Sequence, residues 1–204
     1  MAEDTVNDRK SKRTLIYLAL FFCAPFLLSW YLFNYTSVLH DGGSASHGDL
    51  LAPPRPLPDI SLRDPVNEIA NAGLYGKWTL LYITSNYCDA GCEENLYRMR
   101  QIRLAMGKNT SRVQRAMMIN SSVLSEEIMI KLREYPGQLL YLTDETAADF
   151  ISNFNLSVPD DPFTAGRLYL IDPLGNLMMS YQPNVDPIGI IKDLKRMLRI
   201  SRIG

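Results

Sequence analysis

The chain has 204 residues, of which 47% are hydrophobic, and its 21 Lys and Arg residues against 22 Asp and Glu give a formal net charge of -1. This balance argues against a nucleic-acid-binding protein, which needs a strongly positive surface. The three cysteines are too few for a disulfide scaffold, and the length suits one ordinary domain with attachments.

The N-terminus is predicted to be a membrane anchor. Residues 1–13 form a polar tail, and residues 14–33 form an apolar helix of roughly the 20 residues that span a bilayer. The tail ends in a basic cluster, Arg9, Lys10, Lys12 and Arg13. Basic residues stay on the cytoplasmic side, so we expect the N-terminus in the cytoplasm and the rest of the chain outside it.

Two other interpretations of the N-terminus are less favourable. A cleaved signal peptide needs an Ala-x-Ala-like site, and none follows this long apolar run. A lipoprotein cysteine at Cys23 is disfavoured because Phe22 is bulky and apolar residues continue beyond the cysteine. We therefore expect the helix to be retained.

Residues 34–58 are predicted to form a tether, flexible and Gly/Ser-rich at first and then stiffened by the prolines of residues 53–58. Both histidines of the chain, His40 and His47, fall in this segment. The predicted globular domain, residues 59–204, would then contain no histidine. That excludes a Ser-His-Asp triad and a His/Cys zinc site there, and no Gly-rich phosphate-binding loop is present either.

Strand and helix patterns alternate in the predicted domain. Strands are expected at residues 80–84, 113–119, 139–142, 167–172 and 177–181, with a hairpin turn at 173–176. Helices are expected at residues 93–106, 125–133, 144–154 and from 186 onward, capped at Ser125, Asp144 and Asp186. Their core-facing residues would be Leu96, Met99, Ile102 and Met106, and Ile188, Ile191, Leu194 and Leu198. This order predicts an α/β thioredoxin-like sheet with helices on both faces.

Cys88 and Cys92 follow the first predicted strand, where a helix is expected to begin. The positive end of a helix dipole lowers a thiol pKa, whereas the nearby carboxylates of Asp89, Glu93 and Glu94 oppose that effect. A redox or metal-binding pair and a structural disulfide both remain open. Because Cys88 comes earlier, we expect it to lie nearer the surface.

Other groups could serve a site but also have ordinary explanations. Adjacent methionines offer soft thioether ligands, yet one of each pair must face the core: Met117, Met118, Met178 and Met179. A basic run without acidic residues could be a solvated face or dock an acidic partner or lipid: Arg98, Arg100, Arg103, Lys108, Arg112 and Arg115. The same two interpretations apply to a second basic group near the C-terminus: Lys192, Lys195, Arg196, Arg199 and Arg202. Asp160 and Asp161 lie in a loop expected to face the thiols.

The Cys88-x-x-x-Cys92 spacing at a helix start and the hairpin at residues 169–175 resemble the SCO/SenC copper chaperones of cytochrome c oxidase assembly. The resemblance covers about residues 59–199. Residues 48–57, 78–82 and 96–103 are more narrowly similar to a bacterial SCO-like group described as cytochrome oxidase associated. The resemblance implies a domain on the periplasmic side of a bacterial inner membrane, with Cys88 and Cys92 as the redox or copper-binding residues.

Two positions depart from that family's pattern. The family's copper-binding histidine lies eight residues before the Asp of the hairpin turn, and counting back from Asp172 gives Thr164. The proline that follows the first cysteine is replaced by Asp89. Two thiolates without an imidazole suit Cu(I) but not Cu(II), so Cu(I) is the one metal cofactor that the pair favours.

Three functions follow from these observations. The first is a non-enzymatic assembly factor that contacts a cytochrome c oxidase subunit or a copper or thiol chaperone. The second is a thiol-disulfide oxidoreductase in which Cys88 exchanges with a partner and Cys92 resolves the mixed disulfide. The third is an interaction module with a structural disulfide. We favour the first. The missing imidazole argues against independent copper delivery, whereas the membrane anchor and the order of elements match those of the SCO/SenC family.

Overall fold

The computed structural model describes residues 3–35, 46–58, 73–143, 147–156, 161–201 and 203. The chain divides into two compact units, Met1–Ala45 and Ser46–Gly204. The first contains one long helix, and the second contains the sheet and the remaining helices.

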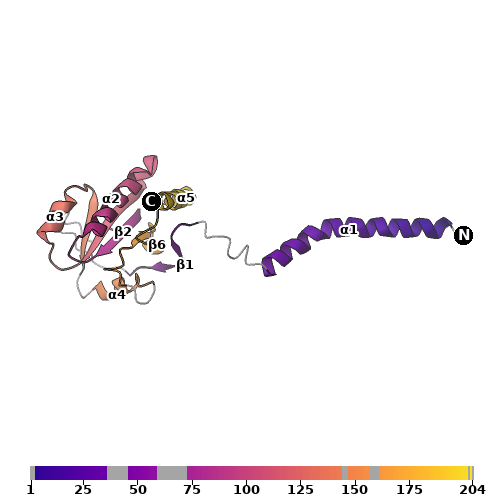
Figure 1. Ribbon diagram of the computed structural model, residues 1–204, viewed down its shortest axis with the longest axis horizontal. Coiled ribbons are helices and arrows are strands. Elements are labelled where there is room, and N and C mark those ends of the chain that lie inside the picture. Colours follow the sequence, from indigo (N-terminus) through magenta and orange to yellow (C-terminus); the bar gives the residue numbers. More distant parts are fainter. Residues whose placement is uncertain are drawn as a thin grey trace. The chain divides into compact units, whose positions relative to one another are not determined.

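Helix α1, Glu3–Tyr35, forms the first unit (Figure 1). Its segment Arg13–Leu32 has 20 residues with a mean hydropathy of 2.0, and none of it is buried. Among the residues described, this is the one helix long and apolar enough to cross a membrane, in agreement with the predicted span at 14–33. The helix begins ten residues earlier than this segment, inside the stretch predicted to be a polar tail.

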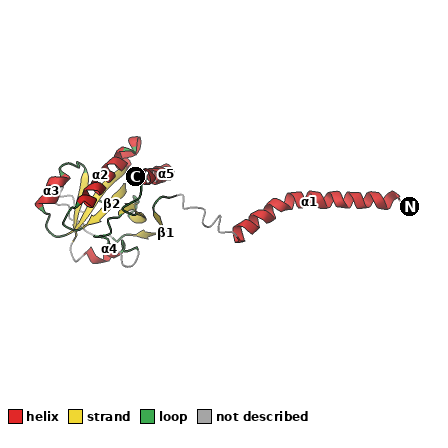
Figure 2. Ribbon diagram, viewed as in Figure 1, coloured by secondary structure: helices red, strands yellow, loops and turns green. Residues whose placement is uncertain are grey.

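The second unit is built on a six-stranded sheet with the order β1-β6-β5-β2-β3-β4 (Figure 2). Strands β2, β3 and β4 are mutually parallel, whereas β5, β6 and β1 join by antiparallel pairs. In chain order the strands are β1 (Asp49–Pro56), β2 (Trp78–Thr84), β3 (Val113–Asn120), β4 (Gln138–Thr143), β5 (Leu168–Ile171) and β6 (Asn176–Tyr181). The site-bearing strand β2 therefore lies inside the sheet, between β5 and β3.

Helices cover both faces of this sheet, as predicted. They are α2 (Ala90–Leu104), α3 (Glu126–Leu132), α4 (Ala148–Ser152) and α5 (Pro187–Ile200), with a 3-10 helix η1 (Gly107–Arg112) after α2. Alternation along β2 sends Leu80 and Tyr82 into one core, beneath α2 and α5. Leu81 and Ile83 enter the other core with Phe150 of α4. The predicted cap at Asp144 lies outside the described residues.

The residues predicted to face the core from α2 are confirmed, whereas the prediction for α5 is partly wrong. Leu194 and Leu198 are buried as predicted, but Ile188 is 57% exposed and Ile190 takes its place in the core. Ile190, Leu194 and Leu198 are spaced by four residues and so share one stripe of the helix, from which Ile188 is rotated away.

The predicted tether is wrong for residues 49–56. They form β1, which pairs antiparallel with β6 at the edge of the sheet. The prolines led to the prediction of a polyproline spacer. An edge strand tolerates proline, however, because only one side of it must supply ladder hydrogen bonds. Leu57 N–H then donates to the Gly175 carbonyl at 3.1 Å. The domain begins at about Ser46 and not at residue 59.

The domain also contains a histidine, contrary to prediction. The backbone N–H groups of His47 and Gly48 donate to Oδ2 of Asp193 on α5, at 2.7 and 3.3 Å. Nδ1 of His47 lies 3.0 Å from the other oxygen, Oδ1. Asp193 is 2% exposed, and burial together with this carboxylate raises the pKa of the neighbouring Tyr181. His40 lies outside the described residues.

Candidate thiol site

Cys88 and Cys92 form a disulfide at the point where the chain passes from β2 into α2, with their Cα atoms 5.1 Å apart. Asp89 is the N-cap of α2, and its Oδ1 accepts from the N–H of Cys92 at 2.9 Å. The helix therefore starts at Ala90, three residues before the predicted start, and Cys92 lies in its first turn. The position predicted for the thiol pair at a strand-to-helix junction is correct.

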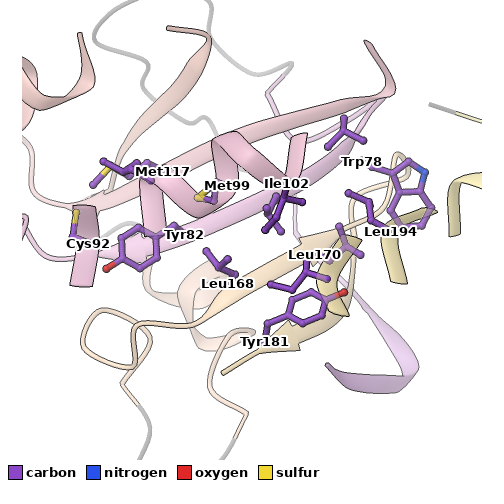
Figure 3. Close-up of a cluster of buried hydrophobic side chains, with 14 of the residues drawn as sticks. Trp78, Tyr82, Cys92, Met99, Ile102, Met117, Leu168, Leu170, Tyr181 and Leu194 are labelled. Atoms are coloured by element: carbon purple, nitrogen blue, oxygen red, sulfur yellow. The ribbon is translucent and has the colours of Figure 1, made fainter. Parts of the chain in front are cut away.

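Both cysteines are buried, at 1% exposure each, so the prediction that Cys88 lies nearer the surface is wrong. They belong to the core cluster under α2, and Figure 3 shows Cys92 beside Tyr82 and Met117 at one end of it. Order along a helix start does not decide exposure: Ser85 and Tyr87, between β2 and Cys88, are exposed, whereas the Cys88 side chain packs into the core under α2. A reagent therefore reaches either sulfur only after the surrounding loop moves.

Lys131 of α3 fixes the loop that carries Cys88. Its Nζ donates to the Cys88 carbonyl at 2.7 Å and forms ion pairs with Glu93, in the first turn of α2, and with Glu127. The hydrogen bond with Glu93 is the main cause of the raised pKa of Lys131. The sequence did not predict this role of Lys131: i,i+4 spacing is a local signal for the Glu127 contact alone, and Cys88 is 43 residues away along the chain.

A pocket of about 310 Å³ opens at the start of α2, lined by Tyr87, Asp89 and Gly91, the sequence neighbours of the two cysteines, but by neither cysteine itself. Its walls come from β2, the first turns of α2 and the loop before β5; they include Tyr82, Asp89, Glu94, Asn95, Phe163 and Thr164. Burial raises the pKa of Tyr82, so this hydroxyl stays protonated in the folded domain. Asp161 holds the turn beside the pocket, since its carboxylate accepts from Phe163 N–H and its carbonyl from Thr164 N–H. Asp160 lies outside the described residues.

The described residues do not fit a Cys2His copper site. They contain no group of three His, Cys, Asp or Glu side chains that could hold a metal ion. Thr164, which the sequence count predicts for the histidine position, lines the pocket with a hydroxyl-bearing side chain, and Nδ1 of His47 lies 3.0 Å from Asp193 on α5. Among the methionines, Met117 and Met118 are both fully buried, one in each core.

The basic run from Arg98 to Arg115 is only in part a solvated face, since Arg100 and Lys108 are exposed and the other four side chains are buried or half-buried. Most of its guanidinium groups bind backbone carbonyls of other segments. Arg98 donates to Pro183 and Val185, Arg103 to Val113, Arg112 to Leu198, Ser201 and Ile203, and Arg115 to Pro136. Burial, followed by the charges of Arg103 and Arg100, lowers the pKa of Arg115 to about 10. These arginines fasten α2 and β3 to the loops and helix around them.

Comparison with known proteins gives a family for this architecture. A model of the family described as "Transmembrane-like, thioredoxin-like, C-terminal domain" matches residues 78–201, and the chain belongs to that family. The sequence matches no curated relative. The family description and helix α1 together fit a membrane-anchored protein.

Solved structures of Sco proteins share the fold. Bradyrhizobium japonicum ScoI with copper bound is 20% identical, with 69% of this chain and 98% of that chain covered and a TM-score of 0.54. Yeast Sco1 with copper bound is 17% identical, with 72% and 95% covered and a TM-score of 0.59. BsSco is 13% identical, with 76% and 98% covered and a TM-score of 0.55; it is described as a cytochrome c oxidase assembly protein with a disulfide switch.

Proposed function

We propose that this chain is a membrane-tethered Sco-like factor that assists cytochrome c oxidase assembly through its Cys88–Cys92 pair and through partner contacts. The observation that carries the proposal is the position of the disulfide, at the β2–α2 junction of a Sco-like domain and beside a pocket. The absence of an imidazole from the described surroundings of the pair argues against independent copper delivery.

The basic tail and helix α1 support a bacterial inner-membrane location with the domain in the periplasm. Positive residues before the span favour a cytoplasmic N-terminus. An oxidising compartment also favours a formed disulfide. The partner in this proposal is an oxidase subunit or a copper or thiol chaperone, whose segment would enter the pocket at the start of α2.

Reduction of the disulfide by a partner dithiol would proceed by thiol-disulfide exchange. A partner thiolate attacks one sulfur, the second sulfur leaves as a thiolate, and a second partner thiol releases the domain as a dithiol while the partner becomes oxidised. The reduced sulfurs could then hold Cu(I) in two-coordinate form, as cargo for the partner. Burial of both cysteines means that partner binding must first open the loop at residues 85–89.

A second candidate, an interaction module with a structural disulfide, is favoured by that same burial. Two measurements on the purified full chain separate the candidates: the reduction potential of the pair and the Cu(I) stoichiometry after reduction. The first proposal expects one Cu(I) per reduced chain, lost in Cys88→Ser and retained in Cys23→Ser, the matched control in the membrane helix. A potential below roughly -300 mV without Cu(I) uptake would leave the structural role.

The cellular test uses a strain that lacks the chain, grown at limiting copper. We expect its haem-copper oxidase content, measured from reduced-minus-oxidised spectra, to fall and to recover with the wild-type chain and with Cys23→Ser. The double variant Cys88→Ser/Cys92→Ser should recover it only in part. Unchanged oxidase content in the deletion strain would refute the proposal, and full recovery by the double variant would assign the function to contacts alone.

A further inference from the structure

The outer face of α5 carries a basic stripe, formed by Lys192, Lys195, Arg196 and Arg199. Their spacing of i, i+3, i+4 and i+7 places the four side chains on one side of the helix, and all four are exposed. The opposite side, with Ile190, Leu194 and Leu198, is buried in the core. The stripe is therefore fixed outward by the packing of the helix.

Helix α5 carries no exposed carboxylate of its own. Its one acidic residue, Asp193, is 2% exposed and accepts hydrogen bonds from His47 and Gly48. The exposed side also presents two large apolar residues, Ile188 at 57% and Ile200 at 76% exposure. Exposed Lys and Arg side chains are attracted to anionic lipid headgroups, and the exposed apolar side chains at the two ends of the stripe can contact the membrane interface beside them.

The first residues of the second unit lie against α5. His47 and Gly48 bind Asp193, and His47 also covers Gly189, where an added Cβ would come within 2.7 Å of the ring. Ten residues, 36–45, separate the end of α1 from Ser46. By chain length alone, that connection spans no more than about 40 Å. A chain of this length, attached beside the basic stripe, is short enough for the stripe to reach a membrane that α1 spans.

We propose that the basic stripe of α5 docks on the anionic phospholipid headgroups of the membrane that holds α1. Each Lys or Arg near an anionic surface favours the bound state by about fivefold, so four of them suffice for a stable orientation on an already tethered domain. The proposal requires α1 to span the membrane and is independent of any role of the cysteines.

Docking through α5 would leave the thiol site open to a partner. Arg98 of α2 binds carbonyls just before the start of α5, whereas Arg112, beyond the end of α2, binds those at the end of α5. The two helices therefore run side by side in the same direction. The disulfide lies at the first turn of α2, and Arg199 lies in the last turn of α5, at the opposite end of this layer.

The test places the full chain in nanodiscs of neutral phosphatidylcholine, or of the same lipid with about one third phosphatidylglycerol. A fluorophore at Ile200→Cys, in a Cys23→Ser background, reports contact through a quencher on the lipid headgroups. We expect strong quenching only in anionic discs, relieved at 0.5 M salt by charge screening. Lys192→Glu/Lys195→Glu should lower the docked-to-free ratio by at least about 25-fold, and Cys88→Ser/Cys92→Ser should leave it unchanged.

The matched control is Lys77→Glu/Arg133→Glu, which changes the net charge equally at two exposed positions outside α5. Quenching retained in this control and lost in the α5 variant supports the stripe. Equal loss in both variants, or quenching independent of lipid charge, would overturn the proposal. Quenching that appears only in native membranes and never in lipid-only discs would also overturn it, and would indicate an acidic protein as the partner.

Discussion

The domain holds its two cysteines at the start of α2 and its one described histidine just before β1, and a distant contact fixes each of these two regions. The carbonyl of Cys88 accepts from Lys131, 43 residues away, at the start of α2. The N–H of His47 donates to Asp193, 146 residues away, on α5. The thiol loop is thus held by a side chain of α3, and the start of the sheet by a side chain of α5. The comparison teaches that contacts between segments far apart in sequence hold both regions in place.

The largest expected effect comes from returning an imidazole to the sulfurs. Thr164→His places a ring on the pocket wall beside the first turn of α2. Loss of a residue that only supports a metal ligand typically changes metal affinity by roughly 10–100-fold, and a direct third ligand should raise the copper affinity of the reduced chain by more than that. The variant should also bind Cu(II) and show a Cu(II)-thiolate absorption band. Competition with a Cu(I) chelator measures the affinity.

The control for this substitution is His47→Ala, which should leave copper affinity unchanged in both the wild-type and the Thr164→His background. An effect of His47→Ala on copper would mean that the two regions are coupled. No gain with Thr164→His would mean that the pocket wall lies too far from the sulfurs.

The histidine region should matter more for stability than for chemistry. Asp193→Ala removes a buried carboxylate that accepts two backbone N–H groups and faces the His47 ring, so we expect a loss of about 1–3 kcal/mol in the free energy of unfolding. His47→Ala keeps both backbone hydrogen bonds and should cost less. Urea unfolding in detergent measures both variants, and equal losses would show that the ring and not the backbone makes the contact.

Alkaline pH should destabilise both regions through a buried tyrosine in each. Burial raises the pKa of Tyr82 near the disulfide and that of Tyr181 near Asp193. Because the folded pKa exceeds the unfolded value of about 10, stability is full below pH 10 and is lost as the pH rises above it. Stability measured between pH 8 and 11 should fall less steeply in Tyr82→Phe and Tyr181→Phe. Tyr87→Phe, at an exposed position, is the control, and an equal change there would contradict the assignment.

The smallest expected effect concerns the loop of Cys88. Lys131→Met removes the donor to the Cys88 carbonyl and two ion pairs, so the loop should open more often and dithiothreitol should reduce the disulfide faster. Timed alkylation of the released thiols measures the rate. Lys192→Met, on α5, should react at the wild-type rate; an unchanged rate in Lys131→Met would show that the loop is held by other contacts.

Much of the fold could be predicted because its signals are local. The apolar run of β2, the Asp186-Pro187 start of α5 and the spacing of Leu96, Met99 and Ile102 each lie within one element. The strand-to-helix position of Cys88 and Cys92 follows from the same patterns. Periodicity and capping depend on neighbours in sequence, and so they are readable without coordinates.

What could not be predicted depends on contacts between distant segments. Residues 49–56 resemble a polyproline spacer until β6 is present to pair with them. The roles of His47 and Lys131 require Asp193 and the Cys88 carbonyl, neither of which is near in sequence. Arg98 and Arg112 were interpreted as surface charges because their acceptors are backbone carbonyls of distant segments, which amino-acid composition cannot reveal. The burial of Cys88 likewise depends on its packing against the core under α2, since its sequence neighbours Tyr87 and Asp89 are exposed.

Strand β1 has a practical consequence for work on this protein. A recombinant fragment cut at residue 59 would omit β1 together with the contact between His47 and α5. The edge of β6 would then expose unpaired backbone groups, which recruit strands from other molecules and promote aggregation. A soluble version should therefore begin before Ser46, so that it carries its own edge strand into solution.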